Sequence, residues 1–193
     1  MHIVAERDDG LRILRIDKLA EAEPWLPAFA GAYQEIWSEP PYNERFSSEE
    51  ASAVLQRALR ITDNITLLAV RESGVVGGFA MAYPVSAKPD VVREIRGLLP
   101  IDRTYYFAEL GVMLQYRRSG LGNQLIALRV ELLDDQRYDH IIMRTSAQKN
   151  ATYEMYKKMG FDDTGVYMEV PARRNDGSFR TDRRLFMAKV VER

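Results

Sequence analysis

The sequence predicts an α/β fold of three layers, in which a mixed, partly antiparallel sheet lies between two sets of helices. Two observations lead to this fold class. Short apolar runs with the period of a strand are followed, in the second half of the chain, by strand-helix-strand-helix-strand units. The C-terminal part is typical of an antiparallel hairpin built around a turn. Because one core fills a chain of 193 residues without splitting, we expect a single domain over residues 1–193.

The first part of the chain predicts one strand and two helices. Apolar and charged residues alternate from Leu11 to Ile16, which indicates a short strand at the edge of the sheet. Residues 24–37 carry aromatic and aliphatic side chains at helical spacing and begin with a proline, so they predict a helix. It ends at the sequence Glu39-Pro40-Pro41. Ser47 and Glu50 form the pattern of a capping box, which places the start of the second helix there.

A hairpin and a long irregular segment follow. The apolar runs 65–70 and 75–83 flank Glu72-Ser73-Gly74 and predict two strands joined by a tight turn. Residues 84–103 contain two further prolines and one short helical pattern at 91–98. Long loops in compact domains are often functional, so this segment is interpreted either as a lid over the substrate or as a surface connector.

The next elements predict the centre of the sheet. Residues 105–114 are apolar on both faces apart from Glu109, as in a strand that is covered on both sides. A helical pattern occupies residues 119–136, and residues 141–144 predict a short strand.

The last part predicts a helix and the closing hairpin. Asn150 is placed to cap a helix that ends at Gly160. The runs 161–170 and 184–191 bracket the turn sequence Asn175-Asp176-Gly177, so they predict a long antiparallel hairpin at the C-terminus.

Composition narrows the classes of function. With 46% apolar and 28% charged residues, the chain has the composition of an ordinary globular protein, and its net charge of -1 predicts neither nucleic acid nor membrane as a partner. The absence of Cys excludes disulfides and thiolate catalysis. His2 and His140 have no neighbours at metal-ligand spacing, so no metal is expected. Residues 1–10 lack the apolar stretch of a secretory signal, which predicts a cytoplasmic protein.

The segment 115–122 is the strongest candidate for a binding site. It lies between the central strand and the start of a helix, where several backbone N–H groups have no partner within the helix. Gly120 and Gly122 allow a ligand to approach the backbone, and Arg117 and Arg118 add positive charge. The segment is therefore interpreted as an anion site suited to a diphosphate, the alternative being a simple tight turn.

Two motifs in this region resemble a known family. The sequence from Glu109 to Leu114, followed by Arg117-x-x-Gly120-x-Gly122, resembles the coenzyme signature of the GCN5-related N-acetyltransferase (GNAT) superfamily. The sequence from Asn150 to Phe161, which includes Tyr156 four residues before Gly160, resembles a second signature of that superfamily. The order of elements fits along the whole chain, but the motifs are confined to residues 105–161. Leu114 stands where the family often has Pro, a departure that affects only the stiffness of the loop.

The resemblance implies a three-layer GNAT-like fold with a C-terminal hairpin, and acetyl-CoA as co-substrate. The loop would bind the pyrophosphate, and the backbone N–H of Val112 would bind the pantetheine arm. Asn150 would contact the same arm, or it acts only as a helix cap. The implied coenzyme-binding residues are Leu110, Val112, Met113, Leu114, Arg117, Arg118, Ser119, Gly120, Leu121, Gly122, Asn150 and Tyr153.

The implied reaction is direct attack of an amine on a thioester. An amine with a pKa of about 10.4 is almost entirely protonated at neutral pH, so a base is needed. Glu109 is the candidate general base, and its low intrinsic pKa requires the assistance of partial burial or a relay water. The alternative is a carboxylate that only caps neighbouring backbone or pairs with an Arg. Tyr156 is the candidate general acid for the thiolate, or it orients the sulfur or only packs in the core.

The acceptor is the part of the reaction that the sequence specifies least. The region between the first two helices, which borders the acceptor cleft in the resembled superfamily, contains Trp37, Glu39, Tyr42 and Glu44. Aromatic faces and carboxylates suit a cationic amine, either a small molecule or a peptide, although these residues also suit a role in covering the core. The acyl length and the oligomeric state, a homodimer included, stay open. The competing hypotheses are a non-catalytic sensor of acyl-CoA and, ranked last, a protein that binds another nucleotide.

Overall fold

The computed structural model describes residues 1–192. Its framework is an eight-stranded sheet with the strand order β1-β2-β3-β4-β5-β6-β8-β7. Neighbouring strands are antiparallel except for β5 and β6, which are parallel. The strands are β1 (His2–Glu6), β2 (Arg12–Ile16), β3 (Ile65–Val70), β4 (Val76–Pro84), β5 (Thr104–Val112), β6 (His140–Ser146), β7 (Asp162–Arg173) and β8 (Phe179–Val190).

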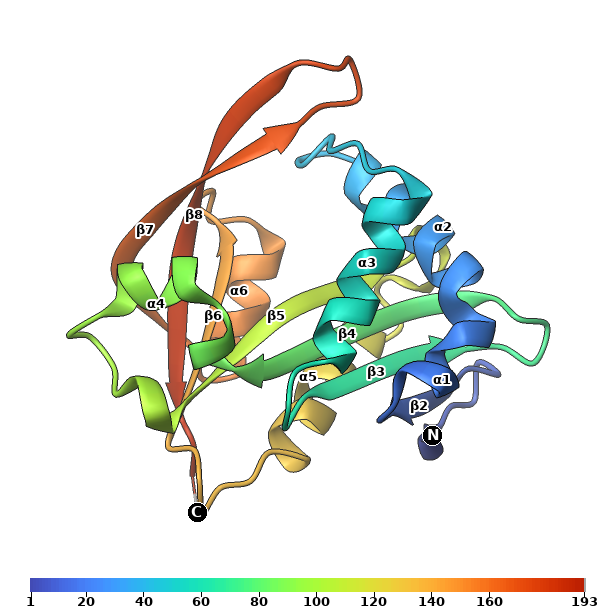
Figure 1. Cartoon of the computed structure of the whole chain (residues 1–193), viewed down its shortest axis with the longest axis horizontal. Helices are drawn as coiled ribbons and strands as arrows, with labels where there is room; N and C mark the ends of the chain where they lie inside the picture. Colours follow the sequence, from blue (N-terminus) through green and yellow to red (C-terminus); the bar gives the residue numbers. More distant parts are fainter. Residues whose placement is uncertain (193) are drawn as a thin grey trace.

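Helices cover both faces of this sheet, so the predicted α/β class with three layers is confirmed (Figure 1). Successive side chains of a strand point to opposite faces. In β5, Phe107 packs in the core that holds α5 and α6, whereas its neighbour Tyr106 packs on the opposite face with α4. Helices α2 and α3 cover the sheet on the α4 side. The helices are α1 (Leu19–Ala22), α2 (Leu26–Ser38), α3 (Ser48–Leu59), α4 (Pro89–Ile95), α5 (Leu121–Glu131) and α6 (Ala151–Lys158).

Both predicted helix caps are confirmed. The Ser47 hydroxyl accepts a hydrogen bond from the backbone N–H of Glu50 at 3.1 Å, and the Glu50 carboxylate accepts one from the backbone N–H of Ser47 at 2.6 Å. The side chain of Asn150 accepts hydrogen bonds from the N–H groups of Thr152 and Tyr153. These side chains satisfy backbone donors that a helix leaves free at its start.

The prediction that Leu11–Ile16 lies at the edge of the sheet is wrong. β1 pairs with β2 on its outer side, with His2 opposite Arg15 and Glu6 opposite Arg12. Residues 2–6 are mostly exposed or half-buried, because a strand at the edge of a sheet has one neighbour only. They consequently lack the alternation that reveals a half-buried strand.

Two other segments differ from their predicted form. Residues 84–103 contain α4 and two short 3₁₀ helices, and Val85, Val91 and Ile95 are fully buried. No residue of this segment lines the cavity described below, which favours the interpretation as a connector. The C-terminal hairpin is confirmed, but its strands are longer than predicted. Near the turn, β8 pairs with β7 and no longer with β6, and the residues of both strands there include several Arg and Asp. These residues lack the apolar pattern that indicates a strand.

Close packing at Gly111 gives a first testable prediction. A Cβ atom at Gly111 overlaps the ring of Phe79, which is fully buried and packs edge-on against Phe29. The Gly111→Ala change should therefore lower the free energy of unfolding by about 1–3 kcal/mol, as other overpacked cores do. Urea unfolding measures this loss. Gly31→Ala is the control, because a Cβ at Gly31 meets no neighbouring side chain or strand within 4 Å. Alanine also has a higher helix propensity than glycine, so this variant should not be destabilised. Equal stability of the Gly111 variant and the wild type would contradict the packing argument.

Candidate active site

The sheet opens between its two parallel strands. The ladder between β5 and β6 ends at the pair Phe107 and Met143, although β5 continues to Val112 and β6 to Ser146. On its other side β5 carries a bulge, because Met81 of β4 pairs with Glu109 and the next residue, Ala82, pairs with Phe107. Bulges redirect side chains and occur beside active sites. The C-terminal half of β5 therefore presents an edge that β6 does not pair.

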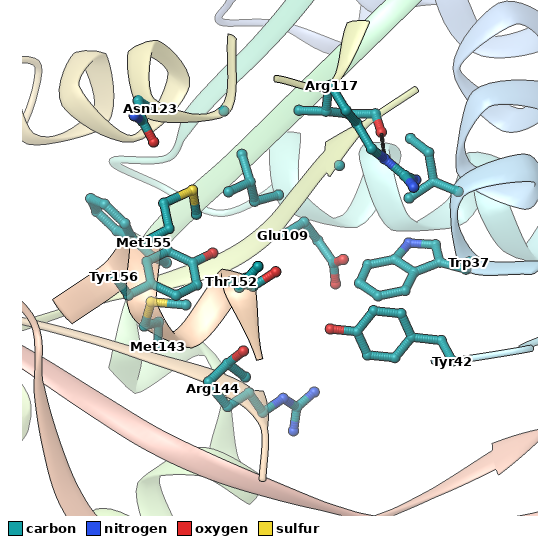
Figure 2. Close-up of a pocket in the computed structure, with 18 of the residues that line it drawn as sticks. Trp37, Tyr42, Glu109, Arg117, Asn123, Met143, Arg144, Thr152, Met155 and Tyr156 are labelled. Carbon is teal, nitrogen blue, oxygen red and sulfur yellow. Dashed lines mark hydrogen bonds between the residues drawn. The ribbon is translucent and has the colours of Figure 1, made fainter. Parts of the chain in front are cut away.

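A cavity of about 660 Å³ occupies this opening. On the α5 and α6 side, its wall is formed by the start of α5 and by α6. On the α2 side, its wall is formed by the end of α2, the loop that follows it, and side chains of β5 and β6. Figure 2 shows that Met155 and Tyr156 lie across the cavity from Trp37 and Tyr42, with Glu109 between the two groups. The cavity thus connects both faces of the sheet.

The start of α5 offers several free backbone donors. The backbone is left-handed at Arg118, with φ of +62°, and at Gly120, with φ of +84°. The N–H of Gln124 donates to the carbonyl of Gly120 at 3.0 Å. The N–H groups of Leu121, Gly122 and Asn123 precede that bond in the first turn, where a helix has no acceptor for them. These donors and the helix dipole make the turn suitable for an anion.

Arg117 and Glu39 form an ion pair beside this turn. A terminal nitrogen of Arg117 lies 2.5 Å from a carboxylate oxygen of Glu39. The Nε of Arg117 donates to the carbonyl of Val112 at 2.9 Å, the hydrogen bond drawn as a dashed line in Figure 2. Arg117 is therefore paired within the chain and holds the loop against the end of α2. Arg118 lines the cavity as well and has no ion pair within residues 1–192.

Glu109 follows the bulge in β5 and points into the cavity (Figure 2). Within residues 1–192 its carboxyl makes no hydrogen bond and no ion pair. Burial raises the pKa of Glu109 to about 7, and the positive charge of Arg144 partly offsets that effect. Near neutral pH, Glu109 can therefore both accept and release a proton.

Tyr156 lies on α6 across the cavity from Trp37 (Figure 2). Burial raises the pKa of its hydroxyl well above the usual value, and the nearby charge of Arg129 partly opposes this shift. The hydroxyl consequently remains protonated at neutral pH and can donate a hydrogen bond or a proton.

Arg129 was not predicted from the sequence as a site residue. It is a buried cation that lies behind the bulge. Its side chain is 1% exposed, and its guanidinium lies 4.1 Å from the centre of the Phe107 ring. It donates to the carbonyls of Met81 and Glu109 at 3.3 and 3.2 Å. Burial lowers the pKa of Arg129 to about 10, so it stays charged at neutral pH. Arg129 thereby holds the backbone of the bulge from which Glu109 projects.

The tip of the C-terminal hairpin lies beside the loop between α2 and α3 (Figure 1). Arg174 donates to the carbonyl of Tyr42, and Arg184 pairs with Glu44 at 2.7 Å. The guanidinium of Arg184 also lies 4.6 Å from the centre of the Tyr42 ring. Tyr42 in turn packs edge-on against Trp37 with ring centres 4.7 Å apart. The hairpin therefore fixes the aromatic wall of the cavity.

The structure brings together most of the residues proposed from the sequence. The predicted residues that line the cavity are Glu109, Tyr156, Leu110, Val112, Arg117, Arg118, Gly120, Gly122, Trp37 and Tyr42. The other predicted residues lie beside the cavity without lining it: Met113, Leu121 and Tyr153 are buried in the cores, Leu114 is 62% exposed, Ser119 and Asn150 bond to backbone, and Glu39 pairs with Arg117.

Several lining residues were not predicted. No local sequence motif indicates which residues of these helices and strands face the cavity. Among the residues missed are Asn123, Arg129, Met143, Arg144, Thr152 and Met155. Among residues 1–192, no group of three or more His, Asp or Glu side chains is arranged to hold a metal ion. No helix in the same range is both long enough and apolar enough to span a bilayer.

The chain is similar to known proteins in sequence and in fold. The family model described as "Acetyltransferase (GNAT) family" matches residues 25–161. N-acetyltransferase family 8 member 2 of Rattus norvegicus is 27% identical over 106 residues, which cover 54% of this chain and 42% of that protein. The match thus spans less than half of that curated relative.

Solved structures share the fold. The ribosomal-protein-alanine N-acetyltransferase of Brucella melitensis superimposes with a TM-score of 0.66 and 21% identity, over 92% of this chain and 98% of that one. A structure from Salmonella typhimurium that contains its cofactor acetyl-CoA superimposes with a TM-score of 0.58 and 18% identity, over 95% of each chain. Since the family model covers residues 25–161, well over half of the sequence, the chain belongs to the acetyltransferase (GNAT) family.

Proposed function

We propose that this protein transfers an acetyl group from acetyl-CoA to the nitrogen of an amine acceptor in a single direct step. One observation carries the proposal. A single cavity joins the free N–H groups at the start of α5, the unpaired edge of β5 and the carboxyl of Glu109. The free N–H groups suit a diphosphate, the unpaired edge of β5 suits an extended thioester arm, and the carboxyl of Glu109 suits an ammonium group.

The coenzyme fits the α5 side of the cavity on chemical grounds. Its pyrophosphate carries two negative charges, which the N–H groups of residues 121–123 and the side chain of Arg118 can bind. Its pantetheine arm carries amide groups that can pair with β5 where β6 has turned away. Backbone donors beside the bulge at Ala108 can polarise the thioester carbonyl.

The proposed chemistry begins at Glu109. Its carboxylate accepts a proton from the ammonium group of the acceptor, and the freed nitrogen attacks the thioester carbon. The tetrahedral intermediate then collapses: the carbon–sulfur bond breaks and the leaving sulfur takes the proton of the Tyr156 hydroxyl. The second proton of the attacking nitrogen restores that hydroxyl, and Glu109 releases the first proton to solvent. The products are the acetylated amine and CoA. A pKa of about 7 suits Glu109 to this task, because a base works best near the operating pH.

A non-catalytic sensor of acyl-CoA is the alternative function. A sensor would bind acetyl-CoA without turnover, whereas an enzyme releases CoA in the presence of a suitable amine. The raised pKa of Glu109 and the cavity-facing hydroxyl of Tyr156 favour the enzyme. Thiol release from acetyl-CoA, followed with amino acids, polyamines, aminoglycosides and peptides, tests the proposal. Binding of acetyl-CoA without turnover of any acceptor would support the sensor instead.

Replacing Tyr156 by Phe should slow turnover only moderately. A CoA thiol resembles a cysteine with a pKa of about 8.5, so the thiolate leaves readily and a proton donor adds about tenfold or less. We expect this decrease in kcat with little change in the KM for acetyl-CoA. Tyr138→Phe is the matched control, since Tyr138 is a buried tyrosine outside the cavity. A Tyr156→Phe enzyme as fast as the wild type would leave this hydroxyl with a packing role alone.

A further inference from the structure

Arg144 lines the same cavity as Glu109, Trp37 and Tyr42, the residues that form its acceptor side (Figure 2). Four arginines line the cavity within residues 1–192. Arg117 and Arg118 flank the anion site, and Arg129 is buried behind the bulge with its donors on backbone carbonyls. Arg144 follows the last pair of the β5–β6 ladder and points to the same side of the opening as Tyr42 (Figure 2).

The guanidinium of Arg144 has few partners in the chain. It makes one hydrogen bond within residues 1–192, from Nη1 to the thioether sulfur of Met168 at 3.3 Å, and a thioether is a weak acceptor. Arg144 also forms an ion pair with Asp90, in which Nη1 lies 3.6 Å from one carboxylate oxygen, beyond hydrogen-bond distance. The other oxygen of Asp90 pairs with Lys88 at 3.1 Å. A guanidinium has five N–H donors. A side chain that is 21% exposed and borders a cavity therefore keeps donors open for a ligand.

The acceptor side of the cavity carries one charge of each sign. Glu109 is the lining residue with a negative charge, and Arg144 is the charged group that affects it most strongly. Trp37 and Tyr42 form the aromatic wall next to them (Figure 2). A polyamine or another purely cationic acceptor would find a partner in Glu109 but would meet repulsion from Arg144. A molecule with an ammonium and a carboxylate finds a partner for each charge.

We propose that the acceptor carries a carboxylate a few bonds from its nucleophilic nitrogen, as an amino acid does, and that Arg144 binds this carboxylate. The inference rests on the proposed acetyl transfer and specifies its acceptor. The planar fork of a guanidinium matches the two oxygens of a carboxylate. With the carboxylate held at Arg144, the nitrogen of the same molecule is directed toward Glu109 and the thioester, which lowers the entropic cost of the reaction.

The test compares matched acceptors at saturating acetyl-CoA. Each set contains a free amino acid, its carboxamide and the amine that lacks the carboxyl group, and thiol release is corrected for the fraction of unprotonated amine. Peptides that begin with Asp or Glu and end in an amide distinguish a side-chain carboxylate from the α-carboxylate of a free amino acid. Spermidine represents acceptors without a carboxylate. The wild type should prefer the carboxylate-bearing members by about tenfold to a hundredfold in kcat/KM.

Variants assign this preference to Arg144. Arg144→Gln should abolish it while the affinity for acetyl-CoA, measured by calorimetry, stays within about twofold of the wild type. Arg144→Lys keeps the charge without the fork and should retain part of the preference. Arg93→Gln, at an arginine that is 73% exposed on α4, is the control and should behave as the wild type.

Each outcome decides between the proposals. Equal use of matched amines and amino acids, or an undiminished preference in Arg144→Gln, would overturn the role of Arg144. Turnover of spermidine or of neutral peptides alone would overturn the carboxylate-bearing acceptor and leave acetyl transfer intact. Binding of acetyl-CoA without turnover of any member of the panel counts against both proposals. If Arg144→Gln does not fold, the comparison of wild type, Arg144→Lys and Arg93→Gln still decides.

Discussion

The Gly122→Trp protein should no longer bind acetyl-CoA. Gly122 is the second residue of α5 and lines the cavity, where a Cβ would lie 3.8 Å from a methyl group of Val112 and 4.0 Å from the sulfur of Met155. An indole at this position must extend into the space between β5 and α6 that the pantetheine arm needs. We expect the affinity to fall by at least about a hundredfold, or about 2.7 kcal/mol.

The matched control is Gly122→Ala. Its single methyl group makes only ordinary contacts with Val112 and Met155, so the affinity should stay close to that of the wild type. Melting temperatures with and without acetyl-CoA measure the difference, because a ligand at a hundred times its Kd stabilises the native state by about 2.7 kcal/mol. For a protein of this size that corresponds to a shift of about 5–10 °C. A ligand-induced shift in the tryptophan variant equal to that of the wild type would contradict the position of the coenzyme.

The Glu109→Gln protein should bind acetyl-CoA normally and turn over at least about a hundredfold more slowly. The amide has the shape of the carboxyl but accepts no proton. In the wild type, kcat/KM for the acceptor should rise with pH through an inflection near 7, because burial raises the pKa of Glu109 to about 7 and only the ionised form is a base. The rate of the Glu109→Gln variant should not show this rise with pH. Native rates in Glu109→Gln across a pH range of about 6 to 9, on both sides of that inflection, would remove Glu109 from the mechanism.

Stability supplies a second measurement on the same variant. Because folding raises the pKa of Glu109, the native state prefers the protonated carboxyl. The corresponding stabilisation is fully present below the ordinary pKa of a glutamate and is lost as the pH rises through about 7. A glutamine has no such loss, so Glu109→Gln should melt at the same or a higher temperature than the wild type at alkaline pH. Slow turnover with undiminished stability then distinguishes a catalytic role from a structural one.

Local chemistry made much of the fold predictable. The caps at Ser47 and Asn150 and the turn at Gly177 depend on residues next to them in the sequence, and each lies where the sequence placed it. The central strand β5 was recognisable because both of its faces are buried. The strand His2–Glu6 was not, since a partly exposed edge strand needs no regular pattern.

The candidate site was predictable only where it is built from neighbouring residues. Gly120 and Gly122 form one motif with the end of β5, so the sequence revealed them together. The bulge beside Glu109 depends on the pairing of β4 with β5, which no local pattern encodes. Arg129 and Arg144 are ordinary charged residues in a helix and a strand until the fold places them at the cavity. The single-domain organisation and the cytoplasmic location stay predictions.

The most direct test of the central claim is calorimetric titration of the wild-type protein with acetyl-CoA. The free N–H groups at the start of α5 predict saturable heat with one molecule of acetyl-CoA per chain, together with binding of CoA itself, which carries the same pyrophosphate. An absence of heat from both ligands up to about 1 mM, the upper end of ordinary KM values, would contradict the account.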